Sequence, residues 1–284
     1  MKSKRTKVFV IVLHFGDSTT TNACLKSILK YQSNFERVLV IDNGLNFKTS
    51  IHNKRIEIIK PKSNLGYSAG MNIGIKYSLS QKADYVLLLN NDTKTEKDFI
   101  SALLNLFKRE KKLGIAGPAI KFRKSGKIVY DLGGKVNLLI GRTSHHEVKR
   151  ITNTLPQNVD YVSGCCMLIK KEVLEKIGLL DEKFFLYYED VDFCLRARKA
   201  GFIVSLLPEV SIYHDLSHSI GRNSSKAIYF QTVSGLFFGG KLGGLNKLYN
   251  FIYIFLQSVC FFLKNPTNGK YALLAFVNKN LFQY

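Results

Sequence analysis

Residues 84–92 read Asp-Tyr-Val-Leu-Leu-Leu-Asn-Asn-Asp, an apolar run that ends in polar residues. The run from Asp84 to Leu89 predicts a buried β-strand, because β-prone apolar residues follow one another without interruption. A carboxylate at the end of a strand, here Asp92, can ligate a hard divalent cation, and the side-chain oxygen of Asn90 can assist it. The same residues could instead form an Asx turn that caps a following helix. The segment by itself leaves both interpretations open.

The sequence on either side of this strand alternates between β-prone and helical segments. Further buried strands are expected at residues 8–14, 37–41, 56–59 and 115–120. One helix is expected directly after residue 17, a second ends at about residue 80, and a third covers about 96–111. This alternation predicts an α/β protein with a mostly parallel central sheet and helices on both faces. Ligands of such sheets bind at the carboxyl ends of the strands. Because Asp17, Asp42 and Asp92 all follow predicted strands, we expect them at that edge.

A glycine-rich turn, Asn64–Gly74, opens one of the predicted helices. Its glycines let the backbone approach a ligand closely, and the following helix offers free N–H groups to a phosphate. The turn does not match the GxGxxG pattern, and the chain contains no P-loop motif. The sequence therefore argues against classical dinucleotide-binding proteins and P-loop nucleotidases.

The region after residue 120 has a different pattern. Short β-prone stretches separated by glycines over 121–162 predict a hairpin and a mobile loop, and His145-His146-Glu147 is assigned to that loop rather than to a metal site. Further along, the sequence predicts an interrupted strand at 159–169, helices at 171–177 and 189–199, and strands at 202–207 and 210–214.

Three carboxylates cluster in Glu189-Asp190-Val-Asp192. Neighbouring carboxylates repel one another, so one of them can acquire a raised pKa and serve as a general base. The same acids could simply stabilise a helix amino terminus. His214 ends an apolar strand, which suits a neutral imidazole ligand, although taken alone the residue is more typical of a hydrogen-bonded histidine at the surface.

The charge of the chain is strongly positive and unevenly distributed. The 284 residues carry 42 Lys and Arg against 21 Asp and Glu, a net charge of +21. All the acidic residues lie between Asp17 and Asp215, whereas residues 216–284 contain seven basic residues, including Arg222 and Lys279, and no acid. A basic segment that is also rich in Phe and Leu favours an anionic membrane surface over a nucleic acid. The five cysteines form no CxxC pair, which is typical of reduced cytosolic thiols, and the amino terminus lacks a signal-peptide cleavage site.

The segment Leu248–Leu263 contains 16 uncharged residues, fewer than the roughly 20 that span a bilayer. On a helix, one narrow polar stripe would be formed by Asn246, Asn250, Tyr253, Gln257 and Lys264. We therefore expect an amphipathic helix at a membrane interface. The alternative is a helix that packs on the core or in the interface of a homo-oligomer.

Taken in order, these motifs resemble the family 2 glycosyltransferases of the GT-A fold, the nucleotide-diphospho-sugar transferase fold. The similarity is greatest to the rhamnosyltransferase-like branch, which builds bacterial surface polysaccharides. It covers about residues 8–220 and rests on residues 8–15, 38–44, 64–74, 88–92, 162–169 and 177–196, together with His214. The resemblance implies a catalytic domain over 1–220, followed by a basic, apolar, helical segment over 221–284 that associates with the membrane.

The resemblance implies a set of residues for the sugar donor. Asp42 would hydrogen-bond the nucleotide base or ribose, and Asp92 and His214 would ligate Mg²⁺ or Mn²⁺. Asn90 stands where the family usually has an acidic residue, which leaves one charged metal ligand fewer. The nucleotide side of the site would further include Asn64, Gly66, Gly70, Asn72, Asp84, Asn90 and Asn91.

The resemblance also implies an acceptor side. Asp190 would be the general base that deprotonates the acceptor hydroxyl, with Glu189 beside it and with Gly164 and Cys165 lining the site. The expected function is inverting, metal-dependent transfer of a sugar, with rhamnose as one candidate, from a nucleotide-sugar to a saccharide or polyprenyl-linked acceptor at the inner face of the membrane. Because the Gln-x-x-Arg-Trp motif of processive synthases is absent, the addition of a single sugar is expected.

Two other functions are alternatives to glycosyl transfer. A non-catalytic basic module that binds a membrane or nucleic acid would suit the net charge, but it gives no reason for Glu189-Asp190 and His214 at this spacing. A nucleotidyltransferase would need a glycine-rich basic loop directly after the first strand, and His14-Phe-Gly-Asp17 is not such a loop.

Overall fold

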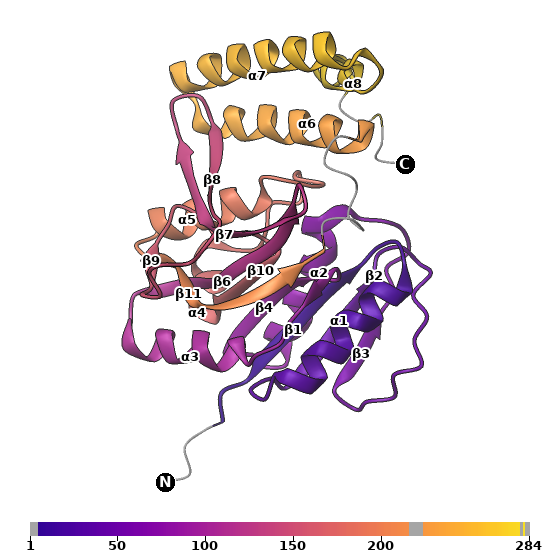
Figure 1. The fold of residues 1–284 in the computed structure, drawn as a ribbon, viewed down its shortest axis with the longest axis vertical. Helices are drawn as coiled ribbons and strands as arrows, with labels where there is room; N and C mark the ends of the chain where they lie inside the picture. The colour runs from indigo at the N-terminus through magenta and orange to yellow at the C-terminus, as the bar shows by residue number, and fades with distance from the viewer. Residues whose placement is uncertain (1–4, 216–223, 279–280, 282–284) are drawn as a thin grey trace.

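The computed structural model describes residues 5–215, 224–278 and 281 (Figure 1). The strands are β1 (Val8–His14), β2 (Arg37–Asp42), β3 (Ile56–Ile59), β4 (Tyr85–Asn90), β5 (Thr93–Lys94), β6 (Leu113–Lys124), β7 (Lys127–Asn137), β8 (Arg142–Val148), β9 (Gln157–Asn158), β10 (Cys166–Lys170) and β11 (Ile203–His214). The helices are α1 (Ser18–Tyr31), α2 (Gly66–Ser80), α3 (Phe99–Arg109), α4 (Lys171–Ile177), α5 (Glu189–Lys199), α6 (Ser225–Leu242), α7 (Gly244–Lys264) and α8 (Pro266–Val277).

The strands of the described residues form one mixed sheet with the main order β3-β2-β1-β4-β10-β6-β11-β5. Its amino-terminal half, β1 to β4, is parallel throughout. All seven residues of β1 are buried, because α1 and α3 cover one face of the sheet while α2, α4 and α5 cover the other. Strands buried on both faces are continuous apolar runs, which is why the sequence identified them. The predicted α/β class, with mostly parallel central strands between helices, is confirmed.

The second half of the sheet mixes strand directions. β10 is antiparallel to both of its neighbours, β4 and β6, whereas β11 is parallel to β6. The two short strands expected at 202–207 and 210–214 are a single strand, β11, whose register shifts between Leu207 and Ser211. Pro208 lies in this gap and has no N–H to contribute to the ladder. Beyond the shift, His214 pairs with Thr93 of β5, which brings it next to the end of β4.

The polar stretch that was expected to be a loop is in part a strand. Residues 142–148 form β8, which is antiparallel to β7. Tyr130 pairs with Val148 at one end of the two strands, and Asn137 pairs with Arg142 at the other. This hairpin extends from the sheet toward α7 (Figure 1). Most of β8 is exposed, so its sequence lacks the apolar alternation by which strands are identified.

The three carboxyl-terminal helices pack on one another, and α6 lies next to the α/β part of the chain (Figure 1). The ring of Phe230 in α6 stacks on Phe185, with ring centroids 4.8 Å apart. No helix of the described residues is long and apolar enough to cross a membrane. The expected boundary between residues 220 and 221 lies outside the described residues, as do Arg222 and Lys279.

Candidate active site

The first of two pockets lies at the carboxyl ends of β1, β2 and β4. It has a volume of about 190 Å³. Its lining combines polar side chains with aromatic rings and consists of Leu13, Phe15, Asp17, Thr20, Asn43, Asn64, Gly66, Tyr67, Asn90, Asn91, Asp92, Phe185 and Leu186. The pocket therefore occupies the edge that the strand pattern predicted for a ligand.

The second pocket is larger, about 650 Å³, and lies beside the first. Tyr67, Asn90 and Leu186 line both pockets, so the two are contiguous. Glu189, Asp190 and the residues around Gly164 line the second pocket next to this junction. Two ligands bound side by side could therefore meet near Asn90.

Asp92 and His214 form a close pair at the junction. Both side chains are largely buried, and Nε2 of His214 lies 3.0 Å from Oδ1 of Asp92. Two ligands that bind one Mg²⁺ at about 2.1 Å and at right angles stand about 3 Å apart, so this separation fits a shared cation. Among the described residues, no group of three or more His, Cys, Asp or Glu side chains is placed to hold a metal. Of the described residues, Asp92 and His214 would be the two ligands, and oxygens of a bound ligand or of water could take further positions.

Asp190 lies at the start of α5, after a strained turn. Tyr187 and Tyr188 both have left-handed backbone conformations, with φ of 69° and 68°, which costs roughly 1–3 kcal/mol for each such residue. The turn directs Asp190 toward the loop before β10, where the Gly164 N–H donates to its Oδ2 at 2.8 Å. Burial raises the pKa of Asp190, and the hydrogen bonds from the Gly164 and Val191 N–H groups oppose that rise. A buried carboxylate with a raised pKa is suited to accept a proton near neutral pH.

Glu189 lies beside Asp190 and is also buried. Its Oε2 has no hydrogen-bond partner among the described residues. Burial, followed by the neighbouring charge of Asp190, raises the pKa of Glu189 well above its ordinary value. Of the two acids, Glu189 has the more strongly raised pKa, so it holds its proton to higher pH than Asp190 does.

The raised pKa of Glu189 should make stability depend on pH. The folded protein keeps this proton above pH 4.5, where the unfolded chain begins to release it, so wild type loses stability as the pH rises from there toward the folded pKa. Glu189→Gln carries no such proton, and its free energy of unfolding relative to wild type should rise over the same window. Urea unfolding of both proteins at about pH 4.5, 6 and 7.5 measures this difference. A difference that stays constant with pH would contradict a neutral Glu189.

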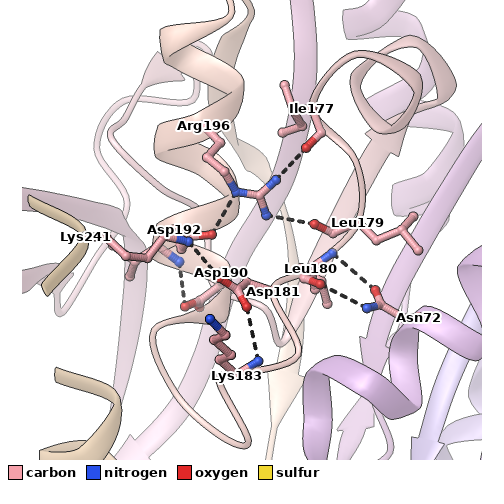
Figure 2. A network of polar contacts seen from close by, with 11 residues as sticks. Asn72, Ile177, Leu179, Leu180, Asp181, Lys183, Asp190, Asp192, Arg196 and Lys241 are labelled. Carbon is pink, nitrogen blue, oxygen red and sulfur yellow. Dashed lines mark hydrogen bonds and ion pairs between the residues drawn. The ribbon is translucent and has the colours of Figure 1, made fainter. Parts of the chain in front are cut away.

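Asp192, the third acid of the cluster, lines neither pocket, and its side chain lies against Arg196 and Lys241 (Figure 2). Its Oδ2 accepts a hydrogen bond from Arg196 Nε at 2.8 Å, and its Oδ1 lies 2.5 Å from Lys241 Nζ in α6. Arg196 also donates to the carbonyl oxygens of Ile177 and Leu179, and Lys241 also pairs with Asp181 at 2.9 Å. Asp192 therefore joins α5 to α6 and to the loop before α5.

The structure brings most of the predicted site residues together. Asn64, Gly66, Asn90, Asn91 and Asp92 line the first pocket, while Gly164, Cys165, Glu189, Asp190 and His214 line the second. Gly66 has φ of 77°, and a Cβ there would lie 2.6 Å from the Phe185 carbonyl oxygen, so only glycine fits this turn.

Asp42 and Gly70 lie just outside the first pocket. The carboxylate of Asp42 is fully buried and accepts the N–H groups of Asn46 and Phe47 at 3.1 Å. It therefore shapes the loop beside the pocket instead of lining it. A Cβ on Gly70 would lie 2.5 Å from Leu13 Cδ1, so this glycine lets α2 pack closely on β1.

Asn72 and Asp84 lie further away. Asn72 Nδ2 donates to the carbonyl oxygen of Leu180, and its Oδ1 accepts the Leu180 N–H, so Asn72 ties α2 to the loop before α5 (Figure 2). Asp84 precedes β4 and accepts the Lys7 N–H at 2.8 Å. The pocket is at the other end of this six-residue strand, about 20 Å away. The structure therefore places Asp84 outside both pockets, at the opposite end of β4 from the first pocket.

Sequence reasoning missed several lining residues. Tyr67, whose hydroxyl donates to the Gly164 carbonyl at 2.6 Å, separates the two pockets and lies within the glycine-rich turn that was identified. Arg142 and His145 of β8 line the second pocket, as do Tyr253 and Gln257 of α7. Because the sequence of β8 is polar, it did not predict a strand, and its lining residues were not identified.

Comparisons with known proteins agree with this geometry. The family model for glycosyl transferase family 2 matches residues 9–178. The low-salt glycan biosynthesis hexosyltransferase Agl10 of Haloferax volcanii is 29% identical over 203 residues, which cover 67% of this chain and 62% of that protein. The dTDP-rhamnosyl transferase RfbF of Shigella flexneri is 28% identical over 222 residues, 77% of this chain and 71% of that protein. An N-acetylglucosaminyl-diphospho-decaprenol L-rhamnosyltransferase of Mycobacterium tuberculosis is 26% identical over 213 residues, 66% of this chain and 68% of that protein.

A similar solved structure is that of GalNAc-T7 with UDP, GalNAc and Mn²⁺. It superposes with a TM-score of 0.62 at 14% sequence identity and covers 88% of this chain and 54% of that one, so it supports the fold alone. The family match spans more than half of the chain, and it begins in β1 and includes the Asn90-Asn91-Asp92 turn. With both pockets at the predicted edge of the sheet, the expected resemblance is confirmed: the chain belongs to glycosyl transferase family 2 and has the GT-A fold.

Proposed function

We propose that this protein is an inverting, metal-dependent glycosyltransferase that moves a sugar from a nucleotide-sugar to a saccharide or polyprenyl-linked acceptor in the synthesis of cell-surface polysaccharide. The observation that carries the proposal is the contiguity of two pockets, one bordered by Asp92 and the other by Asp190. A nucleotide-sugar in the first pocket would present its reacting carbon to an acceptor hydroxyl in the second. Two relatives are named rhamnosyltransferases, so rhamnose is the first sugar to test.

The first pocket would hold the nucleoside diphosphate. Its asparagines offer hydrogen bonds, and the aromatic ring of Phe15 or Phe185 offers a face for a base. Asp92 and His214 would hold Mg²⁺ or Mn²⁺, which would offset the charge that develops on the departing diphosphate. The structure of GalNAc-T7, which shares this fold, was solved with Mn²⁺ and UDP.

Asp190 would act on the acceptor. As the new bond forms between the acceptor oxygen and the anomeric carbon, the hydroxyl proton passes to the Asp190 carboxylate and the bond to the diphosphate breaks. Attack from the face opposite the leaving group inverts the anomeric carbon. The Gly164 N–H would keep the carboxylate oriented during this transfer, and the neutral Glu189 would donate a hydrogen bond within the pocket.

Removing the carboxylate of Asp92 should weaken donor binding that depends on metal. Loss of a residue that merely supports a metal ligand costs about 10–100-fold in metal affinity, so Asp92→Ala should cost at least as much. Calorimetric titration with a panel of nucleotide-sugars, with and without Mn²⁺, measures the change. Asp84→Asn is the matched control, because this carboxylate lies at the opposite end of the same strand. Wild type that binds no donor, or Asp92→Ala that binds as wild type does, would refute the proposed function.

We further propose that the carboxyl-terminal helices rest on the cytoplasmic face of the cell membrane. The stripe Leu248, Ile252, Leu256 and Leu263 faces outward from α7 and is 45–72% exposed. On the other side of this helix Asn250 is buried, and Tyr253 and Gln257 line the second pocket, so the polar stripe faces inward. Lys247 and Lys264 lie near the two ends of the apolar stripe. Apolar side chains framed by lysines suit an anionic bilayer surface.

Replacing Leu248 and Leu256 together by Glu should abolish this binding. Each leucine buried in lipid contributes about 1.5–3 kcal/mol, so affinity for vesicles of phosphatidylglycerol and phosphatidylcholine should fall at least about 100-fold. Flotation of vesicles with the bound protein measures it, and Leu155→Glu, on an exposed loop near β9, is the control. Wild type that stays unbound, or that forms a dimer through α7 in the absence of lipid, would contradict the membrane proposal.

A further inference from the structure

The second pocket is a cleft with three walls of different origin. Its floor contains Asp190, one wall is the hairpin strand β8, and the facing wall comes from α6 and α7. The hairpin and α7 meet where the Asn250 side chain donates to the Ile140 carbonyl oxygen at 3.0 Å. A Cβ on Gly141 would lie 2.4 Å from Asn250 Nδ2, and one on Gly239 would lie 1.8 Å from its Oδ1. These glycines permit the close contact that holds the walls together.

The chemistry of the lining differs between parts of the cleft. Tyr188 and His145 are amphipathic rings with polar atoms, a combination that suits a sugar. The Nδ1 of His145 lies 2.7 Å from the buried carboxylate of Asp131, which fixes the orientation of the ring. Where α7 borders the cleft, Ile254 and Phe261 add apolar surface, and they belong to the same helix that presents leucines outward.

Arg142 is the cation in this lining that has no assigned partner. It is exposed at the start of β8, and its side chain makes no hydrogen bond or ion pair with any residue that the structure describes. The nearby acids are engaged: Asp131 binds His145, and Glu147 binds Lys124. A guanidinium that lies in a cleft without a carboxylate partner is suited to a phosphate, which it can bind through two parallel hydrogen bonds.

We propose that the cleft between β8 and α7 binds the phosphate linkage of a lipid-linked acceptor, with Arg142 in contact with the phosphate. The proposal rests on the function proposed above and specifies its acceptor class. The acceptor sugar lies over Asp190, between His145 and Tyr188. The phosphate follows at Arg142, and the lipid leaves past Ile254 and Phe261 toward the outer face of α7. The carboxyl-terminal helices then form part of the acceptor site.

Two acceptors that differ only in the linkage test this assignment. One is decyl N-acetylglucosaminide, and the other is decyl diphosphate carrying the same sugar. Arg142→Gln should raise the KM of the diphosphate acceptor by about 10–100-fold, the usual effect of losing a charge-assisted hydrogen bond, and should change that of the neutral acceptor less than about twofold. Arg142→Lys should recover part of the loss, because lysine keeps the positive charge but lacks the planar guanidinium that donates two parallel hydrogen bonds. Arg123→Gln is the matched control, because Arg123 is a basic residue of β6, which is separated from β8 by β7, and it does not line the cleft.

Direct binding separates this inference from the proposed function. Calorimetry with decyl diphosphate alone should show binding to wild type and a loss of about 10–100-fold in Arg142→Gln, whatever sugar the enzyme transfers. Equal effects of Arg142→Gln on both acceptors, or unchanged decyl diphosphate binding, would overturn the assignment of Arg142 while donor turnover remained intact. Failure of wild type to bind or hydrolyse any nucleotide-sugar would instead refute the proposed function.

Discussion

Asp190→Asn should lower the rate of sugar transfer by about 10²–10⁴-fold and leave donor binding unchanged. The amide keeps the size of the side chain and an oxygen that can accept the Gly164 N–H, which in the native protein lies 2.8 Å from Asp190 Oδ2. It cannot take up a proton from the acceptor hydroxyl at neutral pH. Single-turnover transfer, measured beside calorimetric donor binding, separates the chemical step from assembly of the site.

The matched control is the neighbouring residue, Glu189. Because burial raises the pKa of Glu189 and so favours its protonated form, Glu189→Gln replaces that form by another neutral donor and should retain most of the rate. Glu189→Ala removes the donor and should cost more. A large loss in Glu189→Gln with near-normal transfer in Asp190→Asn would exchange the roles of the two acids. Transfer unchanged in both variants would show that neither acid is the general base.

Asp192→Ala should lower the free energy of unfolding by about 3–5 kcal/mol, because it leaves two cations beside a buried position without their carboxylate. The side chain of Asp192 is only 5% exposed and contacts Arg196 and Lys241 together. Urea unfolding followed by circular dichroism measures the change.

Asp181→Ala provides the comparison for this prediction. Asp181 pairs with the same Lys241, but its side chain is 28% exposed, so its loss should cost no more than about 1 kcal/mol. A stable Asp192→Ala protein that has lost transfer would mean that all three acids of the cluster serve the reaction. If the Asp192→Ala protein is unstable but transfers sugar normally when folded, Asp192 has a structural role and takes no part in the reaction.

Burial on both faces made part of the fold predictable. The strand over 8–14 matches its expected bounds because all seven of its residues are buried. The strand over 56–59 and the helices over 171–177 and 189–199 also match, although β3 is a half-buried edge strand and neither helix begins with a side-chain cap. The pattern fails for β8, whose side chains are mostly exposed. Arg142 and His145 were therefore left in a loop, and a wall of the second pocket went unnoticed.

Long-range pairing accounts for what else the sequence left open. Asp92 and His214 are brought together by the pairing of β11 with β5, and neither segment alone indicates that contact. A carboxylate next to a strand can face a ligand or bind backbone N–H groups, as Asp42 and Asp84 do here, and residue type does not distinguish the two. The polar stripe of α7 was identified correctly, but only the position of α6 shows that it faces inward.

The contact of Lys241 with Asp192 has a consequence for dividing the chain. A fragment that ends at residue 220 would keep every side chain of the first pocket, yet it would lose Lys241, one of the two cations that contact Asp192. It would also uncover Phe184 and Phe185, which now pack on rings of α6. The carboxyl-terminal helices therefore cannot be treated as a detachable module, and an engineered exchange of tails between relatives would have to carry Asp181, Asp192 and Lys241 together.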